Sequence, residues 1–186
     1  RVLFRSQKPP TAQFTVTGSG SVVLSPEGEG PSVTSATMGK VIDMGITDPF
    51  NMGAAMAPAA VDTIQAHFRD LEIEPSYYDL IVTGDLSKVG YAIANDLFVR
   101  HNFPIKQTTY MDCGMMIYDY ENQQVQAGAS GCACSAVVTY GHLLNRMKRG
   151  ELKRILVVAT GALLSPLSYQ QGESIPCIAH AVSIEA

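Results

Sequence analysis

Two short, almost wholly apolar runs constrain the fold of this chain more than any other feature. They are YDLIVTGD, at 78–85, and RILVVATGALLS, at 154–165. Short apolar runs of this kind, ending in glycine-containing bends, are typical of strands buried inside a sheet. Buried strands need other elements to cover them, so the segments around these two runs are expected to supply helices.

Three segments have the periodicity of such helices. Within 48–71, apolar residues recur at spacings of three, four and three from Val61 to Leu71, which places them on one helical face. Pro58 suits the first turn of this helix, where its missing N–H costs nothing. Two further helices are predicted at 87–102 and 135–149.

The remaining segments predict strands and loops. FTVTGSGSVVLS, at 14–25, predicts two short strands around a small-residue bend, and 32–45 is rich in β-forming residues. The segment 107–124 is expected to be a loop or strand-like, and 175–186 a final strand. Helices that alternate with short apolar strands predict an α/β fold built as a layered sheet.

Composition narrows the functional classes. The chain has 186 residues, of which 46% are apolar and 16% charged, which is enough to build a sizeable core. Its net charge of −4, with no basic run beyond 145–154, argues against a nucleic-acid platform. No apolar run reaches the roughly 18 residues that span a bilayer, so membrane association would need a partner. The four cysteines are expected to be free thiols in a reducing compartment.

The sequence AGASGCACSAVV, at 127–138, holds Cys132 and Cys134 beside a predicted helix start. A structural zinc site needs four ligands, and no second cysteine pair is present, so no metal is predicted. A catalytic thiolate is conceivable at a helix N-terminus, but it needs a base, and His142 and His180 are the nearest candidates. We favour a third interpretation, in which both cysteines act as small packing residues.

Ligands in α/β folds gather at the carboxyl ends of strands, which singles out the residues that follow the two apolar runs. Asp85 is the last residue of the first run, and Thr160, Gly161 and Ser165 lie in the bend that ends the second. The stretch Asp112-Cys113-Gly114 is predicted to be a turn in which the aspartate bonds its own backbone.

The four histidines are not predicted to form a catalytic set. His67 and His101 lie near helix ends on polar stretches, where solvation is expected. His142 lies inside a predicted helix and is expected to be packed. His180 alternates with apolar residues in the last strand, which predicts a core position.

Taken together, these peptides resemble the thiolase superfamily. More narrowly, they resemble the stage V sporulation protein AD family over residues 8–186, through VTGSGSVVLS, DPFNMGAAMAPAA, DLIVTGDLSKVG, GASGCACSAVVTYGHL and RILVVATGALLSP. The resemblance implies a thiolase-like layered α/β sheet that is the C-terminal part of a longer protein. Residues 39–186 would be the second, C-terminal lobe and 1–38 a remnant of the first, with a non-native origin left open for 1–7.

The resemblance also implies a loss of catalysis. Aligned on the thiolase and ketoacyl synthase motifs, Val125 and Gly84 stand where those enzymes carry their catalytic histidines. Claisen chemistry needs a thiolate held by a base, so no thiolase activity, no catalytic residue and no cofactor are expected. The alternative is an active acyl-transferase or thiolase whose nucleophile lies in the missing N-terminal half.

The function that the resemblance implies is binding of dipicolinic acid, or its calcium chelate, for uptake into the spore and release at germination. The expected partners are membrane proteins of the same spore channel complex, at the inner membrane of the spore or forespore, with a homodimer also possible. The ligand would be held in a former acyl pocket. Its expected residues are Asp85, Gly128, Ser130, Gly131, Thr160 and Gly161.

Overall fold

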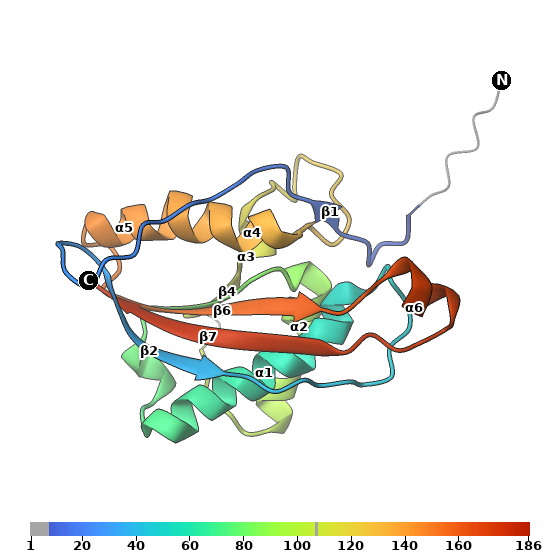
Figure 1. Ribbon diagram of the computed structural model, residues 1–186, viewed down its shortest axis with the longest axis horizontal. Coiled ribbons are helices and arrows are strands. Elements are labelled where there is room, and N and C mark those ends of the chain that lie inside the picture. The colour runs from blue at the N-terminus through green and yellow to red at the C-terminus, as the bar shows by residue number, and fades with distance from the viewer. Residues whose placement is uncertain (1–7, 107) are drawn as a thin grey trace.

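The computed structural model describes residues 8–106 and 108–186, and a five-stranded sheet lies at its centre (Figure 1). The strand order is β2-β7-β6-β3-β4. The bounds are Ser32–Met38 for β2, Cys177–Glu185 for β7, Arg154–Ala162 for β6, Leu80–Thr83 for β3 and Tyr110–Asp112 for β4. Strands β6, β3 and β4 run parallel, and β7 is antiparallel to both of its neighbours. The predicted α/β layered sheet is confirmed.

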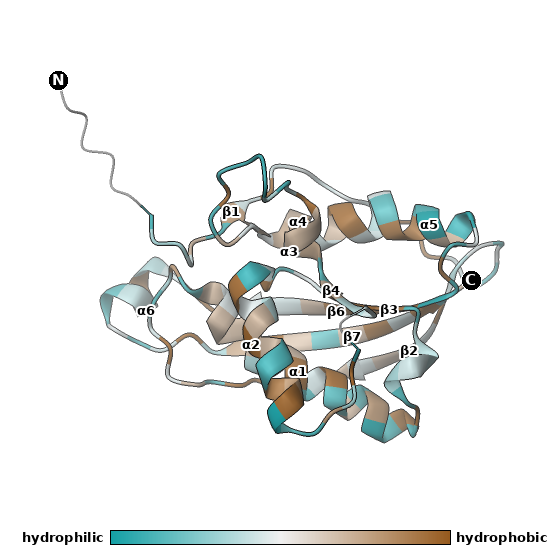
Figure 2. Cartoon of the chain, turned by 180° about the vertical axis from the view of Figure 1, so that it is seen from behind, coloured by the Kyte–Doolittle hydropathy of each residue, from teal (hydrophilic) through white to brown (hydrophobic). Residues whose placement is uncertain are grey.

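Helices cover both faces of this sheet. Helices α1 (Met52–Leu71) and α2 (Ser87–Arg100) lie on one side, and a continuous helical run, 132–148, lies on the other (Figure 1). Figure 2, which shows the chain from behind, colours the helices in alternating hydrophobic and hydrophilic stretches. This is the pattern expected of helices that press one face against a sheet.

The buried strands explain why both layers form. Along β6, Leu156 and Val158 pack into the cluster beneath α1 and α2, whereas Ile155 and Val157 pack into the cluster beneath the run 132–148. Successive side chains of a strand point to opposite faces, so an uninterrupted apolar strand needs cover on both. The two apolar runs of the sequence therefore specify a three-layer arrangement.

Short elements complete the chain. Strand β1 (Phe14–Thr15) pairs in parallel with β5 (Ala129–Ser130), outside the main sheet. The others are the 3₁₀ turn η1 (Pro75–Tyr77), α3 (Cys113–Met116) and α6 (Pro166–Gln170). Among the residues that the structure describes, no helix is long and apolar enough to cross a membrane.

The start of α1 differs from the sequence prediction. The helix begins at Met52, so Pro58 lies in its interior rather than in its first turn. Gly53 and the alanines around Pro58 are buried, and alanine is the best helix former. Their small side chains let the helix begin six residues before Pro58, which periodicity alone does not reveal.

The helical run 132–148 also begins earlier than the predicted residue 135. It comprises α4 (Cys132–Ala136), a π-helical segment η2 (Val137–Leu143) and α5 (Leu144–Lys148). Gly131 precedes the first turn of this run. Its φ of 96° is a backbone conformation that glycine adopts without strain.

The prediction of two strands at 14–25 is wrong beyond Thr15. Only Phe14–Thr15 forms a strand there, and the described structure has none at 16–31. A Cβ atom added to Gly20 would lie 2.9 Å from the Ala136 carbonyl oxygen. The glycines therefore let the backbone cross closely over the helix instead of pairing in a sheet.

The division predicted after residue 38 stays a prediction. Within the described residues, β2 precedes that division and forms the edge of the same sheet as β7, with Met38 opposite His180. The part of the first segment at 1–7 lies outside the described residues.

Candidate functional site

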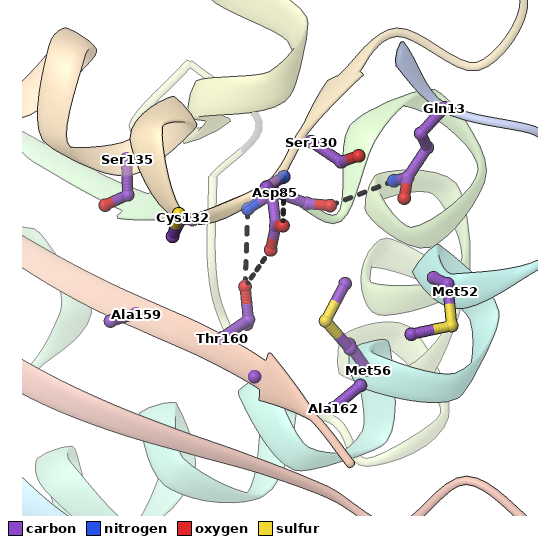
Figure 3. Close-up of a pocket in the computed structure, with 13 residues that line it drawn as sticks. Gln13, Met52, Met56, Asp85, Ser130, Cys132, Ser135, Ala159, Thr160 and Ala162 are labelled. Atoms are coloured by element: carbon purple, nitrogen blue, oxygen red, sulfur yellow. Dashed lines mark hydrogen bonds between the residues drawn. The ribbon is translucent and has the colours of Figure 1, made fainter. Parts of the chain in front are cut away.

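A cavity of about 420 Å³ opens at the C-terminal ends of the neighbouring strands β3 and β6 (Figure 3). One part of its wall is polar and the other apolar. The polar part is formed by Gln13, Asp85, Ser130, Cys132, Ser135 and Thr160, and the apolar part by Met52, Met56, Ala159 and Ala162. Gly84, Gly131 and Gly161 supply backbone between them. The strand-end position agrees with the general location of ligand sites in α/β folds.

Asp85 connects three segments of the cavity wall through hydrogen bonds. Its Oδ1 accepts a 2.7 Å hydrogen bond from the Thr160 hydroxyl, and its Oδ2 accepts a 3.0 Å bond from the Gly131 N–H. Burial raises the pKa of the Asp85 carboxyl, and these two donors partly offset that effect. The carboxyl thus joins the end of β3 to β6 and to the start of the run 132–148.

Gln13 brings the N-terminal segment to the same place. Its Nε2 donates to the backbone oxygens of Asp85, at 2.9 Å, and Leu86, at 3.1 Å. The same side chain also borders a second cavity of about 230 Å³, which shares Met52 and Ser130 with the first. Nothing in the local pattern around Gln13 signals this role, because its partners lie more than 70 residues away.

The helical run 132–148 begins at the cavity wall. The Gly131 N–H donates a hydrogen bond to the Asp85 carboxyl, and the Cys134 N–H donates to the Gly131 backbone oxygen. The amides of Cys132 and Ala133 have no hydrogen-bond partner among the described residues. Free N–H groups in a first helical turn carry partial positive charge, so this part of the wall favours an anionic group.

A second buried carboxyl supports the loop that carries Asp85. Asp112 accepts hydrogen bonds from the Thr83 hydroxyl and from the N–H groups of Leu86, Ser87 and Gly114, all between 2.7 and 2.9 Å. Burial raises the pKa of Asp112 to about 6 in spite of these donors. The predicted bond from this aspartate to its own backbone is confirmed, at the Gly114 N–H, but the predicted turn with Gly114 at positive φ is wrong, because Asp112 ends β4 and caps α3. The same carboxyl also holds the start of α2.

The packing interpretation of the two cysteines is confirmed for one and wrong for the other. Cys134 is buried, and burial raises the pKa of its thiol to about 12. Cys132 is exposed and lines the cavity, because it occupies the first position of the helical run. Within 8–106 and 108–186, no group of three or more potential metal-binding side chains is found.

Five of the six predicted ligand residues lie together at the cavity: Asp85, Ser130, Gly131, Thr160 and Gly161. Gly128 does not line it. That residue turns the chain at φ 117° before β5, and an added Cβ would lie 2.9 Å from the Gly114 oxygen. Ser165, also considered from the sequence, caps α6 instead. The lining residues that the prediction of ligand residues missed are Gln13, Met52, Met56, Gly84, Cys132, Ser135, Ala159 and Ala162.

Three of the four histidine predictions are wrong. His67 is fully buried, with one ring nitrogen 2.8 Å from the Thr37 hydroxyl and the other 2.7 Å from the Tyr78 hydroxyl. His142 and His180 are exposed, and His101 is exposed as predicted. His180 projects from the face of β7 opposite to Ala179 and Ala181, which pack into the core.

None of these histidines lines the cavity in the described part of the chain. Of the two positions that the resemblance assigns to lost catalytic histidines, Gly84 lies in the cavity wall. Val125 lies apart from it, in a polar groove with Lys88 and Tyr120. The two positions are therefore not brought to one cavity.

Comparison with known sequences gives a match over nearly the whole chain. A family model described as stage V sporulation protein AD matches residues 2–185. The expectation that the resemblance leaves out residues 1–7 is therefore wrong. The stage V sporulation protein AD of Bacillus subtilis (strain 168) is 57% identical over 182 residues, which is 98% of this chain and 53% of that protein. The chain thus spans about half the length of this curated relative.

Solved structures with similar architecture are much more distant in sequence. Human mitochondrial 3-ketoacyl-CoA thiolase is 16% identical with a TM-score of 0.40, over 81% of this chain and 30% of that one. The 3-oxoacyl-[acyl-carrier-protein] synthase III of Aquifex aeolicus VF5 is 12% identical with a TM-score of 0.46, over 84% of this chain and 54% of that one.

Proposed function

The chain belongs to the stage V sporulation protein AD family, a family of sporulation proteins, and we propose that it serves in ligand binding. The ligand is dipicolinic acid, a planar pyridine dicarboxylate, taken free or as its calcium chelate for uptake into and release from the spore. The binding site is the cavity at the ends of β3 and β6, and the protein catalyses no reaction on the ligand.

The observation that carries this proposal is the start of the run 132–148 at the cavity wall. A carboxylate placed there meets the first residue of that run, Cys132, and the hydroxyls of Ser130 and Ser135. A concave site with a few convergent polar groups on one side suits a small planar acid. The Asp85 carboxylate would repel a free dicarboxylate, and its oxygens already accept hydrogen bonds from Thr160 and Gly131. A calcium ion carried by the ligand could reach that carboxyl as an oxygen ligand.

The absence of catalysis is part of the proposal. Cys132 is the thiol in the described lining, and no histidine accompanies it there, so a base that could hold a thiolate is lacking. The alternative is an acyl-transferase whose nucleophile belongs to the remainder of the longer relatives. Turnover of acetoacetyl-CoA by the full-length protein above the uncatalysed rate would favour that alternative.

We further propose that the full-length protein works beside membrane proteins of the same spore channel complex, peripheral to the inner spore membrane. A homodimer is compatible with this arrangement, and no nucleic acid is involved. Co-purification of the channel proteins with the full-length protein from spore membranes tests this part, and a fully membrane-free distribution contradicts it.

The binding proposal is tested by narrowing the cavity. Gly161 lines the wall on β6, and a Cβ added to it contacts Ile178 at no less than 3.9 Å. Gly161→Leu in the full-length protein therefore fills part of the cavity without a backbone clash. We expect at least a tenfold loss of dipicolinic acid affinity in isothermal titration calorimetry, because the ligand and the new side chain compete for one space.

The matched control is Gly141→Leu, at an exposed helical position where an added Cβ meets no atom within 4 Å. This variant should bind like the wild type. Wild-type affinity in Gly161→Leu would place the binding site elsewhere, and no binding by the wild type would refute the proposed function itself.

A further inference from the structure

We propose that Met52 and Met56 form the surface against which the ring of the ligand packs, and that this pair selects flat aromatic diacids over saturated ones. The inference rests on the proposed function, because it assigns a role within the same cavity. It concerns the wall opposite the polar groups, which neither the family resemblance nor the sequence pattern singled out.

The two side chains are held at the cavity by the start of α1. They lie four residues apart, hence on one face of the helix, and Figure 3 shows both directed into the cavity beside Ala162. Met52 is half-buried and supplies most of the accessible surface of the pair, since Met56 is only 3% exposed. The helix reaches this position because Gly53 touches the start of α2, where an added Cβ would lie 2.9 Å from the Gly90 nitrogen.

The chemistry of this wall suits an aromatic ring. Thioether sulfur is polarizable and makes favourable contacts with aromatic rings. No aromatic side chain lines the cavity in the described part of the chain, so the methionines provide the contact surface for a ring. Across from them lie Ser130 and Cys132. A planar diacid can therefore direct its carboxylates to the polar wall and its ring to the sulfur atoms.

The experiment uses the full-length protein and two probes of similar carboxylate spacing. Pyridine-2,6-dicarboxylate is aromatic, and cis-cyclohexane-1,3-dicarboxylate is saturated. Met52→Leu and Met56→Leu keep the volume and apolar character of the wall, so the fold should tolerate both. The control is Met44→Leu, because Met44 is 62% exposed and outside the cavity lining.

We expect each cavity variant to lower the affinity for pyridine-2,6-dicarboxylate about 2- to 10-fold, the range that corresponds to the loss of one sulfur–ring contact. Affinity for the saturated diacid should not change, and the Met44 control should behave like the wild type. An equal loss for both probes, or no loss for the aromatic one, would overturn the inference.

A second measurement reports the contact directly. With ¹³C-labelled methionine methyl groups, assigned through the two variants, the Met52 and Met56 signals should move upfield when pyridine-2,6-dicarboxylate is added, because ring currents shield groups stacked on a ring face. Binding without such shifts would overturn the ring-packing role but leave the proposed function standing. If the wild type binds neither probe, the proposed function falls and this inference with it.

Discussion

At the scale of single residues, two neighbouring carboxyl groups support the cavity in different ways. Asp85 lines the cavity and fastens its wall, whereas Asp112 lies behind it, where four donors surround its oxygens. For both groups burial raises the pKa, which is the effect that desolvation has on a carboxyl.

Asp112 is expected to make stability fall as the pH rises. Its pKa in the folded protein, about 6, exceeds the ordinary value of 3.8, so the folded state binds a proton more tightly than the unfolded state. The stabilising contribution is therefore complete below about pH 4 and is lost as the pH rises through 6. Between pH 4.5 and 7 this amounts to about 2 kcal/mol.

Urea unfolding of the full-length protein and of Asp112→Asn at these two pH values checks the prediction. The variant lacks the titration, so its stability deficit relative to the wild type should shrink by about 2 kcal/mol at the higher pH. Asp96→Asn, on the exposed side of α2, is the control. A deficit that is the same at both pH values would contradict the linkage.

At the scale of elements, the crossing of α1 and α2 sets the position of the cavity wall. The two helices touch through Gly53 and Gly90, and a Cβ on Gly90 would lie 2.5 Å from the Gly53 oxygen. Because both partners are backbone, neither can yield without moving a helix. The crossing thus explains why small residues are needed at both positions.

Gly90→Ala should destabilise the protein by about 2 kcal/mol, since the added methyl group overpacks a backbone contact. Gly141→Ala is the matched change at a helical glycine with open space around it, and it should be neutral or stabilising by up to about 1 kcal/mol. Urea midpoints of the two variants check this. Equal effects would mean that helix propensity, rather than the crossing, governs Gly90.

At the scale of the whole molecule, His67 connects the helical layer to the edge strand of the sheet through hydrogen bonds. It links α1 to Thr37 of β2 and to Tyr78, which follows η1. Burial lowers the pKa of His67, and the charge of Asp70 offsets part of this effect. The edge strand β2 is thus held by a neutral, buried imidazole in addition to its hydrogen bonds with β7.

His67 is expected to make stability fall as the pH falls, the opposite of Asp112. With a folded-state pKa below the ordinary value of 6.5, the folded protein binds the proton less tightly. Its stabilising contribution is complete above that ordinary value and is lost at lower pH. Relative to His67→Gln, the wild type should lose stability between pH 7.5 and 5.5 in urea unfolding. His101→Gln, at an exposed site, should show no such difference.

Local patterns were enough to predict most of the elements. The apolar runs that became β3 and β6, and the helix α2, lie close to their predicted bounds, because strand and helix periodicity depend on neighbouring residues. Pro58 and the glycines at 18–20 misled the prediction. Their effect depends on what the backbone packs against, which lies elsewhere in the chain.

The candidate site divides in the same way. The sequence by itself determined the strand-end residues Asp85, Thr160 and Gly161, because the carboxyl ends of buried strands meet at one edge of a layered sheet. Only the tertiary structure decided that Gln13 and the methionines of α1 complete the cavity and that Gly128 lies outside it. Those placements depend on contacts between segments far apart in the chain, which no local pattern encodes.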